Sequence, residues 1–456
     1  MATTYLTRSV SSTSNRRKWT WSGWLKRGRT HSGGSDYIFS SNNGSNQYSM
    51  LAFASDTLRY YDYTSSFQSE IKTNRLFRDT NGYYHIVITY DSAQGTASNR
   101  IKFYVNGVQE TSLQTSTYPS QNNDSYMNYS GLPFQIGRET GTNNYNGIMS
   151  HIHFTDGYAY DASAFGETDA TTGEWKIKTS PSVTYGTNGF FILKDGNTIT
   201  DSSPNSNNFA VGSGTLTKTE DSPSNVFATM NPLANAVVAP VGLTQGNNTV
   251  TMSTSRGGIF STLSCTGGKY YAEMKIATMP TDSRFNIGIL PKPITIADDP
   301  NTTGNDAIVL SGYNAVIYAN SGSGTGVLNN FYGNATGRFS GTPILGCAVD
   351  LESATRTMAI SINGAWVTGS NATSTDFSNA LKVDISTPVA LEDNWFFACG
   401  SSTSSGSMGV YNWNFGNGYF GTTAVASAGT NASGNGIFEY DCPTGYTALS
   451  TKGLNL

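Results

Sequence analysis

The chain has 456 residues and a formal net charge of −4, and only 13% of its residues are charged. Because the only basic cluster is short, within residues 16–29, the charge pattern excludes an extended surface for nucleic acid. No apolar run approaches the ~20 residues of a membrane span, and residues 1–18 lack the apolar core of an export signal. We therefore expect no nucleic-acid partner, no membrane insertion, and a protein that stays in the cytosol or leaves it by lysis.

The length favours more than one domain, and the composition favours strands. The chain contains 49 glycines, and 12% of its residues are aromatic, which is typical of many short strands joined by tight turns. Its four cysteines show no CxxC spacing and no neighbouring histidine, so free buried thiols are expected instead of a zinc site. They are Cys265, Cys347, Cys399 and Cys442.

Strand patterns begin near the N-terminus, at Trp19–Trp24, Tyr37–Phe39 and Met50–Phe53. The clearest hairpin follows, because His85–Tyr90 leads through a polar loop to Ile101–Val105. This second strand alternates apolar and polar residues, and it ends on Asn-Gly at 106–107, which suits a type I′ turn.

The same pattern returns in the second half of the chain. Ile344–Val349 leads through a polar loop to Met358–Ile362, which ends on Asn-Gly at 363–364. Between the halves, residues 221–233 carry two prolines and no strand alternation, which indicates a boundary. We predict an all-β protein of two tandem antiparallel β-sandwich (jelly-roll) domains, residues 1–225 and 241–456, joined by a linker at 226–240.

The first half resembles the concanavalin A-like sandwiches of the laminin-G and pentraxin type, through Gly82–Asp91 and Ile101–Val108. A further series resembles a module of phage structural and tail proteins. It comprises His153–Gly157, Phe165–Asp169, Gly173–Trp175, Tyr185–Phe190, Asp201–Phe209, Asp221–Pro223 and Ala228–Leu233.

The second half resembles a SPRY domain, with Gly268–Lys275 as its early strand and Gly346–Asp350 with Ile362–Gly364 as its central hairpin. Asn414–Gly416 and the tail Phe438–Leu449 are similar to the closing segment of that family. Both resemblances imply folds that present binding loops, without implying catalysis or naming a ligand.

Catalytic patterns were sought and none has the required spacing. Glu167, Asp169 and Glu174 come near the Glu-x-Asp-x-x-Glu strand of concanavalin A-like glycosidases, but Thr172 occupies the third position. Turn residues around a structural Trp175 are the better interpretation. His31 and His85 have no partner in a nucleophile motif, and no enzyme activity is expected.

Signals for metal sites in the sequence are equally weak. His151 and His153 are two apart on an expected strand and could share one face, yet no carboxylate cluster adjoins them. Residues 298–306 contain oxygen ligands that suit calcium but lack an EF-hand pattern. We expect no metal and no cofactor.

Aromatic rings beside polar residues leave carbohydrate binding open, since a flat ring can stack on a sugar. The candidates are Tyr61 and Tyr63 beside Asp62, together with Tyr313 and Trp366. Trp366 lies two residues past an expected turn, so it either projects from the rim of the second domain or completes its core.

Three functions remain open. The preferred one is a non-catalytic virion structural protein, a tail or capsid appendage assembled in the host cytoplasm. It would bind other virion proteins, form homo-oligomers and attach to a host-surface glycan. The alternatives are a glycan depolymerase on a concanavalin A-like scaffold and a free lectin.

Overall fold

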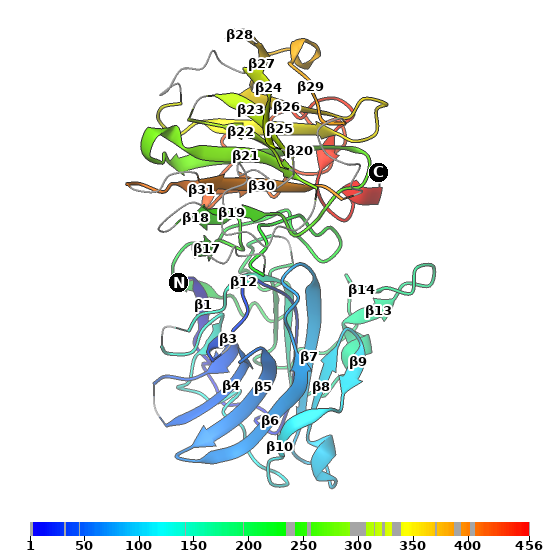
Figure 1. Ribbon diagram of the computed structural model, residues 1–456. Coiled ribbons are helices and arrows are strands. Elements are labelled where there is room, and N and C mark those ends of the chain that lie inside the picture. The colour runs from blue at the N-terminus through cyan, green and yellow to red at the C-terminus, as the bar shows by residue number, and fades with distance from the viewer. Residues whose placement is uncertain are drawn as a thin grey trace. The chain divides into compact units, whose positions relative to one another are not determined.

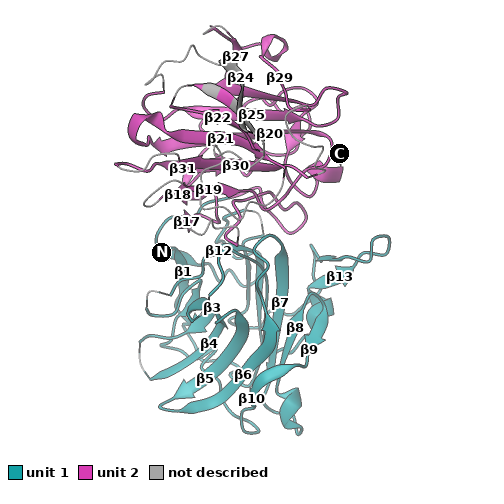
Figure 2. Cartoon of the chain, viewed as in Figure 1, with its two compact units in different colours: residues 1–218 teal, residues 219–456 magenta. Residues whose placement is uncertain are grey.

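The computed structural model describes residues 3–31, 33–44, 46–141, 143–194, 196–233, 242–252, 257–291, 307–313, 315–321, 324–330, 339–369, 372–386, 394–401 and 406–455. These residues form two compact units, Met1–Lys218 and Thr219–Leu456 (Figure 2). Helical structure in the described residues is limited to single 3-10 turns: η1 (Ala97–Asn99), η2 (Ala162–Ala164), η3 (Thr281–Ser283), η4 (Phe377–Asn379) and η5 (Gly453–Asn455). The predicted all-β class is confirmed.

Unit 1 is a sandwich of two antiparallel sheets (Figure 1). The eight-stranded sheet has the order β10 (Leu113–Thr117), β6 (Phe67–Leu76), β5 (Thr57–Thr64), β4 (Gln47–Ala54), β3 (Ser35–Ser41), β11 (Phe134–Ile136), β1 (Tyr5–Arg8), β16 (Ala210–Ser213). The six-stranded sheet has the order β15 (Phe190–Ile192), β12 (Gly147–Asp156), β2 (Lys18–Arg27), β7 (Tyr83–Asp91), β8 (Ile101–Val105), β9 (Val108–Glu110). A separate hairpin pairs β13 (Gly166–Thr168) with β14 (Trp175–Ile177).

The core of unit 1 lies between its two sheets. Strand alternation directs Leu51 and Tyr60 inward from one sheet and Trp19, Trp21 and Phe154 inward from the other. The Trp19 ring lies 5.6 Å from that of Tyr60, centroid to centroid, so the two sheets are in direct aromatic contact.

Unit 2 is a second sandwich. Its ten-stranded sheet has the order β17 (Gly242–Thr244), β18 (Thr249–Thr251), β31 (Val410–Asn414), β20 (Lys269–Thr278), β25 (Ile344–Asp350), β26 (Thr357–Ile362), β27 (Ala365–Gly369), β28 (Ala372–Ser374), with β29 (Val383–Asp384) on β26 and β34 (Thr447–Ala448) parallel to β20. The six-stranded sheet has the order β19 (Gly257–Phe260), β30 (Phe396–Ser401), β21 (Phe285–Leu290), β22 (Ile308–Ser311), β23 (Val316–Ser321), β24 (Gly324–Asn330). A short hairpin pairs β32 (Tyr419–Phe420) with β33 (Thr423–Ala424).

The division between the units falls earlier than the predicted linker at 226–240. Phe227, Ala228 and Met230 are all buried within unit 2. The Ala228 N–H donates to the carbonyl of Leu449, which ties this segment to the C-terminal end of the chain. Residues 226–230 therefore belong to the second unit, while residues 234–241 of the expected linker lie outside the described residues.

The repeated hairpin takes the expected form in both units. Asn106 and Gly107 have φ angles of 47° and 83°, and Asn363 and Gly364 have φ angles of 49° and 79°. Each asparagine side chain also accepts a backbone N–H, from His85 at 2.8 Å in unit 1 and from Ile344 at 2.9 Å in unit 2. The predicted type I′ turns are thus confirmed, and a hydrogen bond to each asparagine side chain adds to them.

The four cysteines are free and buried, as predicted. Burial raises the pKa of Cys399 to about 12, so its thiol is protonated at neutral pH. The indole N–H of Trp413 contacts its sulfur at 3.2 Å.

A buried carboxylate fastens the C-terminal segment to β20. The two oxygens of Glu273 accept the backbone N–H groups of Glu439 and Tyr440, each at 2.9 Å. The Tyr271 hydroxyl and the Asn414 amide donate to the same carboxylate, each at 3.2 Å. Burial raises the pKa of Glu273 to about 7, against the lowering effect of these donors.

We expect this carboxyl group to make the stability of unit 2 depend on pH. Because the folded pKa lies above the ordinary value of 4.5, the contribution is fully present below pH 4.5 and is lost as the pH rises through about 7. The free energy of unfolding of unit 2 should fall by about 3 kcal/mol over this pH range. Denaturant unfolding of the wild type and Glu273→Gln at pH 4.5 and 8 measures it, because the amide does not titrate. The same pH slope in both proteins would contradict the assignment.

Candidate glycan-binding face of the eight-stranded sheet

Strand β5 places aromatic rings on the outer face of unit 1. Tyr60 and Asp62 point into the sandwich and are buried. Because neighbouring residues of a strand point to opposite faces, Tyr61 and Tyr63 lie on the outer side of the eight-stranded sheet. Both rings were candidates from the sequence, and the structure puts them on one surface.

The adjacent strands add two further rings. Tyr48 of β4 and Phe67 of β6 both pair with Tyr63, one from each side. The Tyr48 and Tyr63 rings are stacked at a centroid distance of 5.0 Å, and Phe67 meets Tyr63 edge-on at 5.3 Å. We call Tyr48, Tyr61, Tyr63 and Phe67 the aromatic face. Phe67 was not a candidate from the sequence, because it is aligned with Tyr63 only through a register shift between Asp62 and Tyr63.

The rings of the aromatic face differ in exposure. Phe67 is 47% exposed and Tyr61 only 6%, while Tyr48 and Tyr63 are half-buried. Burial, followed by the neighbouring Tyr37, raises the pKa of Tyr61, so its hydroxyl is protonated at neutral pH. Tyr61 therefore forms the floor of the surface, and Phe67, Tyr63 and Tyr48 present ring area to solvent.

Charged side chains border the aromatic face on the β6 side. The guanidinium carbon of Arg59 lies 4.4 Å from the Tyr61 ring centroid and 5.2 Å from that of Phe67. Its Nε donates to Glu70 Oε1 at 2.7 Å. Rings flanked by charged hydrogen-bonding groups can stack on the apolar face of a sugar and bind its hydroxyls.

The other two carbohydrate candidates, Tyr313 and Trp366, lie in unit 2. Tyr313 is half-buried just after β22, with the Arg284 guanidinium carbon 4.0 Å from its ring centroid. The four candidates are therefore divided between the two units.

Trp366 is only 4% exposed, so the expectation that it projects from the rim is corrected. Its ring packs edge-on against Phe377 at 4.6 Å and lies 6.0 Å from Tyr271. Phe438 and Tyr446 of the C-terminal segment belong to the same buried cluster. That segment covers the outer face of the ten-stranded sheet, and Trp366 is a core residue beneath it.

The acidic residues near Trp175 form a turn, as expected. Glu167 lies on β13, and Asp169 caps the loop by accepting the N–H groups of Thr171 and Thr172, each at 2.9 Å. These bonds and the ammonium of Lys176 hold the pKa of Asp169 below its ordinary value. A carboxyl group with a lowered pKa is a poor general acid.

The structure also shows a Ser–His pair that no sequence motif connects. Ser22 Oγ lies 2.9 Å from His85 Nε2, and the indole N–H of Trp175 donates to His85 Nδ1 at 2.9 Å. Burial lowers the pKa of His85 to about 3, so the ring is neutral. Since Nδ1 accepts, Nε2 carries the proton and donates to Ser22. A histidine in this tautomer cannot take the serine proton, as a catalytic base would have to do.

The two histidines of β12 do not form the shared site considered from the sequence. A register shift falls between Ser150 and His153, and His151 has a φ of 49°. His153 is buried, with Nδ1 at 2.9 Å from the Tyr185 hydroxyl. The residues 298–306 considered for calcium lie outside the described residues.

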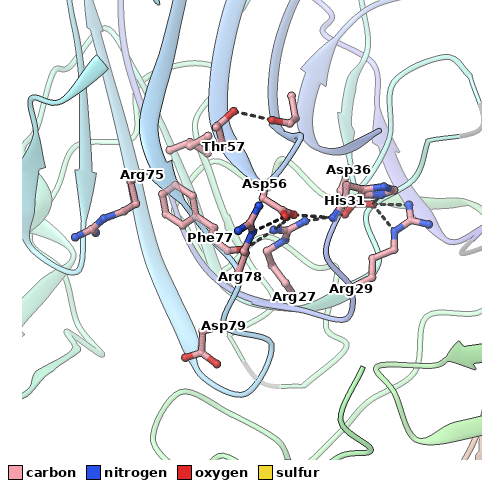
Figure 3. Close-up of polar contacts among 12 residues, drawn as sticks. Arg27, Arg29, His31, Asp36, Asp56, Thr57, Arg75, Phe77, Arg78 and Asp79 are labelled. Atoms are coloured by element: carbon pink, nitrogen blue, oxygen red, sulfur yellow. Dashed lines mark hydrogen bonds and ion pairs between the residues drawn. The ribbon is translucent and has the colours of Figure 1, made fainter. Parts of the chain in front are cut away.

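Part of the basic stretch near the N-terminus takes part in an ionic cluster of unit 1 (Figure 3). Arg27 lies between two aspartates, 2.9 Å from Asp56 and 3.5 Å from Asp36. Arg29 binds Asp36 at 2.5 Å and Arg78 binds Asp56 at 3.2 Å. Although burial alone would raise it, bonds from the His31 N–H and Arg27 hold the pKa of Asp56 below its usual range. Three guanidinium groups thus meet two carboxylates, and their ion pairs join β2 to the segments around Asp36 and Asp56, which is a structural role.

Comparison with known proteins agrees with the fold of unit 1. The model of the concanavalin A-like lectin/glucanases superfamily matches residues 2–164. No match to a curated protein was found.

Several solved structures are similar at low identity. The SPRY domain of human HERC1 is 14% identical over 40% of this chain and 96% of its own, with a TM-score of 0.29. Mouse laminin α1 domains LG4-5 are 11% identical over 96% of this chain and 93% of their own, with a TM-score of 0.27. A pentraxin of Limulus polyphemus is 18% identical over 47% and 90%, with a TM-score of 0.29. These scores are too low for the function of any of these proteins to be transferred to this chain.

We predict that Trp366→Ala lowers the free energy of unfolding of unit 2 by ~3–5 kcal/mol, because a buried indole is removed from a packed layer. Denaturant unfolding of the full chain measures the loss. Phe67→Ala is the control, since an exposed ring should change stability by less than ~0.5 kcal/mol. A small loss for Trp366→Ala would contradict its placement in the core.

Proposed function

We propose that this chain is a non-catalytic glycan-binding protein of a phage particle, and that the aromatic face of unit 1 is its glycan site. The observation that carries the proposal is the cluster of Tyr48, Tyr63 and Phe67 on the outer side of a sheet, with Phe67 47% exposed. Solvent-facing rings on a rigid sheet offer a preformed stacking surface, which limits the ordering cost of binding.

Binding without cleavage is favoured over a depolymerase. The superfamily that residues 2–164 match includes glucanases as well as lectins, so the fold allows either function. However, Asp169 is engaged by Lys176 at 3.0 Å in a hairpin turn, and Ser22 faces a neutral histidine that donates to it. Neither group is arranged to act as an acid, a base or a nucleophile.

The virion role rests on the phage-like motif series, whose residues form ordered loops here. The side-chain amides of Asn205 and Asn207 donate to the carbonyl of Gly189, and Asp201 accepts the Phe191 N–H at 2.8 Å. We propose attachment to other virion proteins and assembly into homo-oligomers, because several copies raise the avidity of weak sugar sites. The protein should be found in purified particles, whereas a free lectin would be absent from them.

The glycan site is tested by removing its most exposed ring. Phe67→Ala should weaken binding to host-surface polysaccharide about three- to tenfold. This is the change in affinity expected when one aromatic stacking contact is lost. The melting temperature should stay unchanged, since the ring is half exposed. Isothermal titration and thermal melts of the full chain measure both quantities.

Val108→Ala is the matched control, because Val108 is 71% exposed but lies on β9 of the other sheet. It should bind as the wild type does. Unchanged binding by Phe67→Ala together with Tyr63→Ala would overturn the assignment of the site.

Incubation of the full chain with the same polysaccharide should release no new reducing ends, because binding without cleavage is proposed. Their appearance, abolished by Glu167→Gln or Glu174→Gln, would instead establish the depolymerase.

A further inference from the structure

The outer side of β5 and β6 carries two cations next to the aromatic face. Arg59 and Lys72 are paired directly across the two strands. Ile71 and Thr73 are buried, so Lys72 between them points to the outer side, where Arg59 and Glu70 also lie. The guanidinium carbon of Arg59 lies 5.2 Å from the Phe67 ring centroid, so the cation paired with Lys72 reaches the exposed ring.

One carboxylate lies beside these two cations, and it binds only one of them. Glu70 binds Arg59 through the 2.7 Å bond to its Nε. The side chain of Lys72 makes no hydrogen bond or ion pair with any residue in the described part of the chain. Like charges directly opposite each other in a sheet are destabilising, so an uncompensated cation at this position favours an anion from outside.

The charge is different at the other end of the aromatic face. Burial and the neighbouring tyrosines raise the pKa of Tyr48, and the carboxylate of Glu139 adds to this effect. Glu139 therefore adds negative charge near Tyr48, whereas Lys72 lies on β6, the strand that carries Phe67.

We propose that the aromatic face takes a carboxylated glycan, with the acid group at Lys72 and a sugar ring against Phe67 and Tyr63. This rests on the proposed function and names its ligand class. A carboxylate attached to a sugar ring lies at the ring edge, so an acidic sugar next to the one stacked on Phe67 along the glycan presents a single negative charge to the single uncompensated cation. The ammonium group would form a charge-assisted hydrogen bond with it.

The test compares acidic polysaccharides with their own neutral forms. Hyaluronan, alginate and polygalacturonate are titrated into the full chain, each beside its carboxyl-reduced form, with dextran sulfate as the sulfated probe. At least one carboxylated chain should bind about tenfold more tightly than its reduced form. Rising salt should weaken that binding and leave the reduced form unaffected.

Three substitutions locate the effect. Lys72→Met should abolish the preference for the acid form while leaving binding of the reduced form unchanged. Lys72→Arg keeps the charge and should retain the preference. Lys102→Met, on β8 of the other sheet, is the control for loss of a lysine and should behave as the wild type.

The outcomes separate the two proposals. Equal binding of acid and reduced forms, an acid preference that survives Lys72→Met, or tighter binding of dextran sulfate would overturn the carboxylate site while leaving glycan binding intact. Absence of binding to every glycan by a folded protein would contradict glycan binding itself, and the carboxylate site with it.

Discussion

The two-residue period of strand β5 is the constraint on which unit 1 and its candidate site both depend. Tyr60 packs on Trp19 in the core, and Asp62 beside it accepts hydrogen bonds from Tyr60 and Ser69, each at 2.7 Å. A slip of one residue would move the satisfied Asp62 into solvent and reverse both faces of the strand. The buried side of the strand thus fixes the outward direction of Tyr61 and Tyr63.

The outer faces of the sheets differ in whether other segments of the chain cover them. This difference explains why rings of the aromatic face are exposed. In unit 1, Phe165 and Trp175 pack over the six-stranded sheet, in one cluster with Val87. In unit 2, Phe438 and Tyr446 cover the ten-stranded sheet. By contrast, the rings on the outside of the eight-stranded sheet include Phe67, which is 47% exposed. Clustered solvent-facing rings mark interaction surfaces more often than single exposed residues do, which is the physical basis of the glycan proposal.

Local signals in the sequence were sufficient for much of the fold. Asn-Gly needs only its own backbone preference to specify a type I′ turn, and both predicted turns are present. The structure adds a second reason for glycine there. A Cβ at Gly107 would lie 2.6 Å from the Trp175 ring, and one at Gly364 would clash with the ring of Tyr440. In both units a ring from another part of the chain packs on the turn.

The site was less predictable because it depends on distant segments. The burial of Trp366 follows from a C-terminal segment that crosses the sheet, which the residues around the turn do not reveal. Phe67 joins the aromatic face only through a shift in strand register. Tyr61 and Tyr63 could be found because strand alternation needs no long-range information. The Ser22–His85 contact joins residues 63 positions apart and required the sheet pairing itself.

The central claim is that a glycan stacks on the outer side of the eight-stranded sheet. Aromatic NMR spectra of the full chain, with phenylalanine and tyrosine rings labelled, test this directly during titration with fragments of host-surface polysaccharide. We predict that the ring signals of Phe67, Tyr63 and Tyr48 shift together and saturably, while those of the buried Phe154 and Phe438 stay unchanged. Saturable binding that leaves the Phe67, Tyr63 and Tyr48 signals in place would show that the glycan binds elsewhere and would contradict the account.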